Sequence, residues 1–216
     1  GGKQLGFEDP RGQLFLEYVR IVKLKRPKFF VIENVQGILE DKHKLSLAFI
    51  IRSLQSIGYS IKYQLLNAAD YRIPQDRFRV FFVGIRNDLQ NTFTFPTAVT
   101  DKKITLKEAI GDIIESPRFF NEETITEEHP TRKNHDVYTG SYDAKYMARN
   151  RVRSWNEQSF TIQAQARNEP QHPQAPKMTY ISSDKRIFAK GYELLYRRLS
   201  VRECARIQTF PDSFVF

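Results

Sequence analysis

The residues Phe29-Phe30-Val31-Ile32-Glu33-Asn34-Val35 give the strongest indication of the fold in this sequence. Its first four residues form a continuous apolar run, which is typical of a strand that is covered on both faces of a sheet. Directly after this run the chain presents a carboxylate, Glu33, and an amide, Asn34. Because ligands of α/β sheets bind outside the carboxyl ends of strands, we expect these two side chains at a functional edge. The simpler alternative is a strand-end acid that caps the next turn.

Helices and strands alternate on either side of this stretch. Apolar side chains at helical spacing predict helices over residues 14–24 and 45–57, and Gly58 stands where a helix cap belongs. Residues 61–66 and 78–85 are predicted to be strands. Such alternation favours an α/β sheet with helical crossovers between its strands.

The pattern weakens near Gly111, where we expect a change of domain. Residues 112–136 are polar and acidic, and residues 137–196 mix aromatic residues, arginine, glutamine and proline without a helical period. The sequence therefore predicts a first domain over residues 1–111 and a smaller, irregular, mostly β or loop domain over residues 112–216.

Two capping boxes, Thr105–Glu108 and Ser200–Glu203, predict that short helices begin at these positions. The single cysteine of the chain, Cys204, falls inside the second of these helices. A reactive thiol would need exposure and a low pKa. We therefore interpret Cys204 as a small buried hydrophobic residue.

Two arginines, Arg77 and Arg79, stand at the start of the strand predicted after Gln75 and Asp76. Alternation along a strand places both on one face, while Phe78 points to the other. Two guanidinium groups on one face suit the binding of a carbonyl oxygen or a phosphate. Two solvated arginines on an edge strand are an equally good interpretation of this pattern alone.

The chain is basic, with a net charge of +9 and a sequence pI of about 9.6. A basic protein suits a polyanionic partner, and positive charge is denser in the last third. Arginine and aromatic residues interleave there: Arg149, Arg151, Arg153, Arg167, Tyr146, Trp155 and Phe160. Arginine pairs well with guanine O6 and N7, so this pattern indicates nucleic-acid binding. A cationic loop without a ligand is the alternative.

Other features set limits. A single cysteine excludes an internal disulfide framework, and the cysteine and four histidines show no metal-ligand spacing. No apolar run approaches the roughly 20 residues of a membrane helix. The chain also has no glycine-rich nucleotide loop.

Taken together, these segments resemble the C5-cytosine DNA methyltransferases of bacterial restriction-modification systems. Glu33-Asn34-Val35 matches the family's ENV motif, and Gln75-x-Arg77-x-Arg79 matches its QxRxR motif. Residues 198–212, RLSVRECARIQTFPD, match a long motif near the family's C-terminus. Residues 6–15 are similar to the end of the family's mobile active-site loop and the helix after it. The resemblance implies an incomplete Rossmann-like methyltransferase sheet and a β-rich target-recognition domain over residues 112–216.

The resemblance also implies roles for individual residues. In the family, a cysteine thiolate adds to C6 of a flipped cytosine, and C5 then takes the methyl group of S-adenosylmethionine. Glu33 would bind N3 and the exocyclic amine, and Arg79 would bind O2. Arg77 would support the carboxylate or a phosphate, and Asn34 would fix the nucleophile loop. By the same match, Arg11 would contact the DNA backbone and Leu14 would lie against the cofactor through its main chain.

The region between residues 147 and 178 looks like the branch that methylates the inner cytosine of GGCC. Arg149, Arg151 and Arg167 would then read guanines in the major groove, with Arg153 in the same basic stretch. Thr161 matches a position that touches a phosphate beside the flipped base. The implied partners are double-stranded DNA and a functionally paired restriction endonuclease, and no membrane partner is expected. The resemblance also implies that the complete protein is a monomer and lies in the bacterial cytoplasm at the nucleoid.

Three family parts are not found in this sequence: the glycine-rich cofactor motif, the Pro-Cys dipeptide with the nucleophile, and the final Gly-Asn-x-Val-type segment. We therefore expect a piece of a larger enzyme that exposes apolar surface at a sheet edge and transfers no methyl groups alone. Three alternatives stay open: one subunit of a two-polypeptide methyltransferase, a DNA-binding module without catalysis, and a tRNA-methylating relative.

Overall fold

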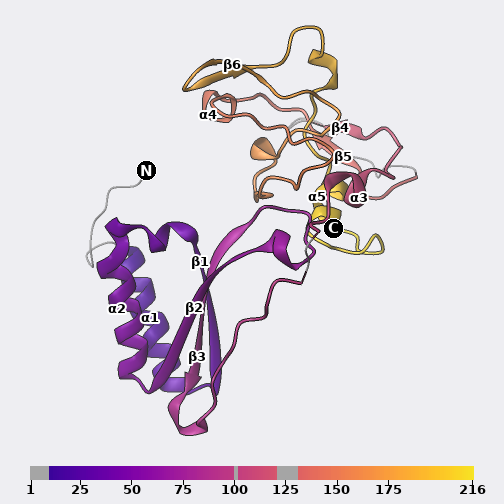
Figure 1. The fold of residues 1–216 in the computed structure, drawn as a ribbon. Coiled ribbons are helices and arrows are strands. Elements are labelled where there is room, and N and C mark those ends of the chain that lie inside the picture. Colours follow the sequence, from indigo (N-terminus) through magenta and orange to yellow (C-terminus); the bar gives the residue numbers. More distant parts are fainter. Residues whose placement is uncertain (1–9, 100–101, 121–130) are drawn as a thin grey trace. The chain divides into compact units, whose positions relative to one another are not determined.

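The computed structural model describes residues 10–99, 102–120 and 131–216, with side chains described from Leu14 onward. Contacts divide the chain into two compact units (Figure 1). The first contains the residues up to Leu66 together with Phe78–Thr97, and the second contains Asn67–Arg77 and Ala98–Phe216.

The first unit is built on a three-stranded sheet. Its strands are β1 (Phe29–Val35), β2 (Tyr59–Asn67) and β3 (Phe78–Arg86), in the order β1-β3-β2. β1 and β3 are antiparallel, with Val35 opposite Arg79. The carboxyl end of β1 therefore lies beside the amino end of β3. This confirms the predicted strands and places the ENV segment beside Arg79, the last residue of the QxRxR segment.

Two helices cover one face of this sheet, α1 (Pro10–Lys25) and α2 (Lys44–Ser56). Val22 of α1 and Leu54 of α2 form a core with Phe30 of β1 and Tyr59 of β2. The short 3₁₀ helices η1 (Gln36–Leu39), η2 (Asp41–His43) and η4 (Asn87–Leu89) complete the unit. Gly58 follows α2 with φ +91°, a left-handed conformation that closes the helix through its N–H to the carbonyl of Gln55.

β1 is buried on one face only. Phe30 is buried, but Phe29, Val31 and Val35 are 64%, 54% and 57% exposed. The expectation of a strand covered on both faces is therefore wrong for the described chain, because α1 and α2 both pack on the Phe30 side. The sequence predicts exposed apolar surface at a sheet edge, and the structure shows it on this open face of β1. Strand alternation places Glu33 on the same face.

The second unit is irregular, but it is the larger of the two units and not the smaller domain that the sequence predicted. It contains the paired strands β4 (Arg118–Phe120) and β5 (Asp136–Tyr138), which are parallel, and β6 (Thr179–Ser182) and β7 (Lys185–Ile187), which are antiparallel. The remaining elements are short helices: α3 (Leu106–Ile110), α4 (Ala144–Met147), α5 (Val201–Ile207), η3 (Ala68–Tyr71), η5 (Ala166–Asn168) and η6 (Glu193–Leu195).

α3 and α5 pack together in one of the hydrophobic clusters of this unit. Leu106 and Ile110 of α3 are buried together with Leu199, Cys204 and Ile207. The predicted boundary near Gly111 therefore lies inside the second unit, because the helix just before it packs on the helix near the end of the chain. Both predicted capping boxes are present and begin α3 and α5.

Within the described ranges, no helix is long and apolar enough to cross a membrane. The same residues contain no group of three His, Cys, Asp or Glu side chains that could hold a metal ion.

Candidate functional site

Glu33 and Arg79 form an ion pair at the end of the sheet in the first unit. Arg79 Nε lies 2.7 Å from Glu33 Oε1. The two residues are diagonal neighbours on one face, since Val35 pairs with Arg79 and Glu33 pairs with Phe81. Arg79 is mostly buried, with 22% of its side chain exposed, whereas 45% of the Glu33 side chain is exposed. The pair therefore presents a carboxylate that is oriented by a guanidinium and reachable from outside.

Arg79 is further fixed by its own strand, because its Nη1 donates to the carbonyl of Phe78 over 2.8 Å. Asn34 uses its side-chain oxygen locally, as acceptor for the N–H of Val35 at 2.8 Å. Because successive side chains of a strand point to opposite faces, this local bond fixes the amide of Asn34 on the face of β1 opposite to Glu33.

Arg77 lies outside β3. The strand begins at Phe78, so the argument that alternation puts Arg77 and Arg79 on one face does not extend to Arg77. The main chain of Arg77 belongs to the second unit, where its N–H donates to Asn67 Oδ1 at 2.9 Å and its carbonyl accepts from Ala68. The role of its side chain stays a prediction.

The residues predicted near the cofactor and the DNA backbone lie at the start of α1. Leu14 is 71% exposed. The side chain of Arg11 and residues 6–9 of the matched loop lie outside the described residues. Both assignments stay predictions.

The arginines predicted to read DNA occupy different environments in the second unit. Arg149 is exposed in the bend after α4, and Arg167 is exposed on η5 with its Nε donating to the Tyr138 hydroxyl. Arg151 is half-buried: its Nε donates to the carbonyl of Tyr146, and its Cζ lies 4.5 Å from the centre of that ring. Burial lowers the pKa of the Arg151 guanidinium. Exposure favours Arg149 and Arg167 as the groups that can reach a ligand.

Arg153 and Thr161 both contact Asp76, a residue that the sequence reasoning missed. Arg153 Nη2 lies 3.3 Å from Asp76 Oδ2, and the Thr161 hydroxyl donates to the carbonyl of Asp76 over 2.8 Å. The signal was weak because Asp76 stands at an unspecified position of the QxRxR match and its partners are far away in sequence.

The long C-terminal motif contributes buried charge. Arg198, Arg202 and Glu203 are at most 1% exposed. Arg198 donates to the carbonyls of Tyr138, Gly140 and Ser141. Since buried guanidinium groups need several acceptors, these bonds fix the course of the irregular chain. The motif is therefore a folding element of the second unit.

Glu203 is the centre of this buried network. It accepts from the N–H of Ser200 in the capping box and from both Nη atoms of Arg197, at 2.8 and 2.7 Å. Burial alone would raise the pKa of Glu203, but the hydrogen bonds and charge of Arg197 outweigh it, so this pKa is lowered. Glu203 is thus held ionised inside the unit.

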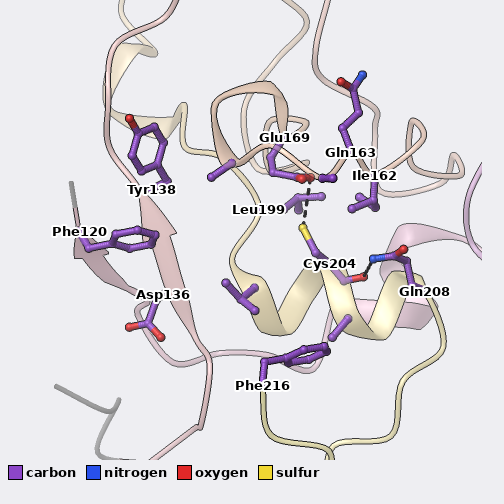
Figure 2. Close-up of a pocket in the computed structure, with 14 residues that line it drawn as sticks. Phe120, Asp136, Tyr138, Ile162, Gln163, Glu169, Leu199, Cys204, Gln208 and Phe216 are labelled. Carbon is purple, nitrogen blue, oxygen red and sulfur yellow. Dashed lines mark hydrogen bonds between the residues drawn. The ribbon is translucent and has the colours of Figure 1, made fainter. Parts of the chain in front are cut away.

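A cavity of about 430 Å³ lies beside α5 in the second unit (Figure 2). Its walls include Phe120, Tyr138, Glu169, Cys204 and Phe216. Cys204 Sγ and Glu169 Oε2 face each other across 3.4 Å (Figure 2). Burial raises the pKa of Glu169 to about 7 and raises the pKa of the Cys204 thiol well above its usual value. The interpretation of Cys204 as a small buried residue is confirmed.

Residues 1–216 match, over their whole length, the family model described as C-5 cytosine-specific DNA methylase. The Type II methyltransferase M.MthTI of Methanothermobacter thermautotrophicus is 49% identical over 215 residues, a match to 100% of this chain and 65% of that protein. M.NgoPII of Neisseria gonorrhoeae is 44% identical over 225 residues, which span 100% of this chain and 64% of that protein. The chain therefore spans just under two-thirds of the length of these relatives.

Solved structures give the same fold at low sequence identity. A prophage-encoded E. coli protein has a TM-score of 0.63 and 21% identity, over 96% of this chain and 66% of its own. The Dnmt2 methyltransferase of S. pombe has a TM-score of 0.51 and 16% identity, over 99% of this chain and 64% of its own. These likenesses support an α/β methyltransferase fold. Together with the match over the whole chain, they show that this protein belongs to the C-5 cytosine-specific DNA methylase family.

Proposed function

We propose that residues 1–216 form part of a DNA (cytosine-5-)-methyltransferase of a restriction-modification system. The observation that carries this proposal is the Glu33–Arg79 ion pair at the open end of the sheet. The substrate would be a cytosine flipped out of a short duplex site, and the family uses S-adenosylmethionine as methyl donor.

The pair suits the difficult step of this chemistry. When a nucleophile adds to C6, negative charge develops on the ring at N3 and O2. The Glu33 carboxyl, which is 45% exposed, would bind N3 and the exocyclic amine and hold a proton at N3. The guanidinium of Arg79 would bind O2 and stabilise the developing charge there. Because the ion pair and the Phe78 carbonyl fix Arg79 in advance, little reorganisation is needed at the moment of reaction.

The nucleophile would come from outside these 216 residues. Cys204 is the only cysteine in the sequence, and it is buried with a raised thiol pKa inside the second unit. Leu14, the one residue assigned to S-adenosylmethionine, has an exposed side chain on α1 and would contact the cofactor through its main chain. Nucleophile and most of the cofactor site are therefore assigned to other parts of the complete enzyme.

The second unit would recognise the target sequence. Residues 112–216 are proposed as the main part of the target-recognition domain, with Arg149, Arg151 and Arg167 reading guanines of a GGCC-like site. The exposure of Arg149 and Arg167 supports this assignment. Thr161 would reach a backbone phosphate, and Arg11 would add a second backbone contact.

The test is transfer of labelled methyl groups from S-adenosylmethionine to duplex DNA. We expect no transfer by the 216-residue chain alone, and transfer to the inner cytosine of GGCC by a chain extended to the length of its relatives. Duplexes with one altered base pair test the GGCC recognition sequence. A tRNA substrate tests the alternative that the protein is a tRNA-methylating relative. Transfer by the short chain alone would overturn the assignment of the nucleophile, and transfer to tRNA but not DNA would overturn the substrate.

A further inference from the structure

The segment before β3, residues 74–77, belongs to the second unit, and backbone hydrogen bonds connect it to Ser159 of the same unit. The N–H of Asp76 donates to the carbonyl of Ser159, and the N–H of Ser159 donates to the carbonyl of Pro74, each over 2.9 Å. The Thr161 hydroxyl donates to the carbonyl of Asp76. Three consecutive peptide groups, from Pro74 to Arg77, are thus bound to residues 159–161, and these bonds fix the path of the chain just before Arg77.

Buried polar side chains strengthen this attachment. Gln75 is 2% exposed, and its Oε1 accepts from the N–H of Ile162 at 3.3 Å. Asn67, at the end of β2, is 5% exposed and accepts from the N–H of Arg77. Such groups are costly to bury unless they are bonded, so their pairing makes this arrangement specific.

Asp76 joins these contacts through its carboxylate. Asn67 Nδ2 donates to Asp76 Oδ1 over 3.1 Å, and Arg153 Nη2 lies 3.3 Å from Asp76 Oδ2. One oxygen therefore binds Asn67 and the other binds Arg153, and all three residues belong to the second unit.

Arg153 is oriented toward this cluster. Its Nη1 donates to Glu157 Oε1 over 3.1 Å, and its Cζ lies 4.3 Å from the centre of the Phe160 ring. Its Nε is buried, without a hydrogen-bond partner among the described residues. The guanidinium is thus committed to two carboxylates and one ring of its own unit, which is a poor starting position for reading a base edge.

We propose that Asp76 is a positioning residue that, with Arg153 as its partner, sets the entry of the chain into β3 and thereby holds Arg79 in place for reaction. Arg79 follows Asp76 by three residues, so Asp76 would act on Arg79 through the backbone of the two residues between them. Arg153 is on this account a structural partner of Asp76 and not a reader of DNA sequence. The inference rests on the proposed function, because it concerns turnover of the same site.

The experiment uses the complete enzyme, with wild type, Asp76→Asn, Arg153→Gln and the double variant. We expect each single variant to lower kcat by about ten-fold or more, since a small misplacement of a catalytic group is costly. The affinity for cognate duplex, and the preference over a duplex with one altered base pair, should stay within about two-fold. The double variant should be no worse than the poorer single variant, because both remove one interaction.

Glu115→Gln is the matched control. Glu115 and Arg132 form an ion pair of similar exposure in the same unit, with 29% and 22% of their side chains exposed against 25% and 29% for Asp76 and Arg153. The kcat of the Glu115→Gln variant should equal that of wild type. Arg153→Lys keeps the positive charge, so it should recover part of the kcat that Arg153→Gln loses. If Arg153→Gln does not fold, Arg153→Lys takes its place in the experiment.

The outcomes separate the possible errors. If wild type does not methylate cytosine, the proposed function fails. If wild type methylates and Asp76→Asn keeps full kcat, the positioning role of Asp76 is refuted. If Arg153→Gln loses discrimination at one base pair by ten-fold or more with kcat unchanged, Arg153 reads a base. A loss of kcat in Glu115→Gln equal to that in Asp76→Asn would show a general effect of weakened stability and would also refute the proposal.

Discussion

Arg79 Nε lies 2.7 Å from Glu33 Oε1, on the face of β1 that the described helices leave open. The antiparallel register of β1 and β3 makes these residues diagonal neighbours. An ion pair that is this exposed contributes little to stability by itself. The ion pair instead orients the guanidinium of Arg79 and the carboxylate of Glu33 before a substrate binds.

We predict that Arg79→Ala in the complete enzyme lowers kcat by about 100-fold or more, the usual cost of losing a donor that stabilises developing negative charge. The affinity for DNA should change little, since the arginine acts on the reacting base. Single-turnover kinetics together with equilibrium DNA binding measure the two effects separately. Weakened DNA binding with normal turnover would reject the catalytic role of Arg79.

Arg167→Ala should relax sequence specificity. Arg167 is exposed on η5, and a guanidinium that reads one guanine contributes roughly 1–3 kcal/mol of discrimination at that base pair. The measurement is binding to a set of duplexes with single base-pair changes. Equal weakening on all of them, with a smaller dependence of affinity on salt, would make Arg167 a phosphate contact instead.

The two capping boxes should differ in their importance for folding. Glu203 is fully buried and holds Arg197, whereas Glu108 is exposed in the box that begins α3. Glu203→Gln should lower the free energy of unfolding by about 3 kcal/mol or more, because it leaves a largely buried guanidinium without its carboxylate. Glu108→Gln should cost much less. Urea unfolding of both variants gives the comparison, and equal losses would show that the buried ion pair adds nothing to the cap.

Glu169 should make stability fall as pH rises. Its folded pKa of about 7 lies above the usual value of 4.5, so the folded state binds more protons than the unfolded state between these values. His172 acts in the opposite direction: burial lowers its pKa from 6.5 to about 4, so its contribution to stability rises with pH across that window. The two slopes, each up to about 1.4 kcal/mol per pH unit, oppose one another between about pH 4.5 and 6.5.

Glu169→Gln removes one of these two slopes. We expect the free energy of unfolding of this variant to rise with pH between about pH 4.5 and 6.5 more steeply than that of wild type. Above pH 7 the variant should be the more stable protein, because no carboxylate must be ionised beside Cys204. Urea unfolding at a series of pH values measures this. Parallel curves for wild type and variant would mean that Glu169 titrates normally.

Much of the secondary structure was predictable from short stretches of sequence. The helical spacing of residues 45–57 and the two capping boxes each gave the observed element, since their hydrogen bonds are made within a few residues. The apolar run before Glu33 gave the observed strand through its residue types, although its hydrogen-bond partners in β3 are far away in sequence. The burial of Cys204 followed from the chemistry of an ordinary thiol. The motif match assigned Glu33 and Arg79 to one site, and their side chains form an ion pair, while their roles stay a prediction.

Other features could not be predicted in this way. Coverage of β1 on one face depends on which helices pack against it, and the strand sequence is the same in either case. The basic stretch looked uniform, yet Arg149 is exposed, Arg151 lies on Tyr146 and Arg153 binds Asp76. No local pattern distinguishes these three arginines, because their partners come from other segments.

Local sequence patterns were enough to predict the kinds of elements, their order and the chemical groups available at the end of β1. Tertiary contacts determine which charges meet, which guanidinium groups are buried and which can reach a ligand. The physical reason is that helix caps and strand alternation depend on neighbours along the chain. The environment of a charged side chain instead depends on long-range packing, which removes water and supplies acceptors such as the carbonyls around Arg198.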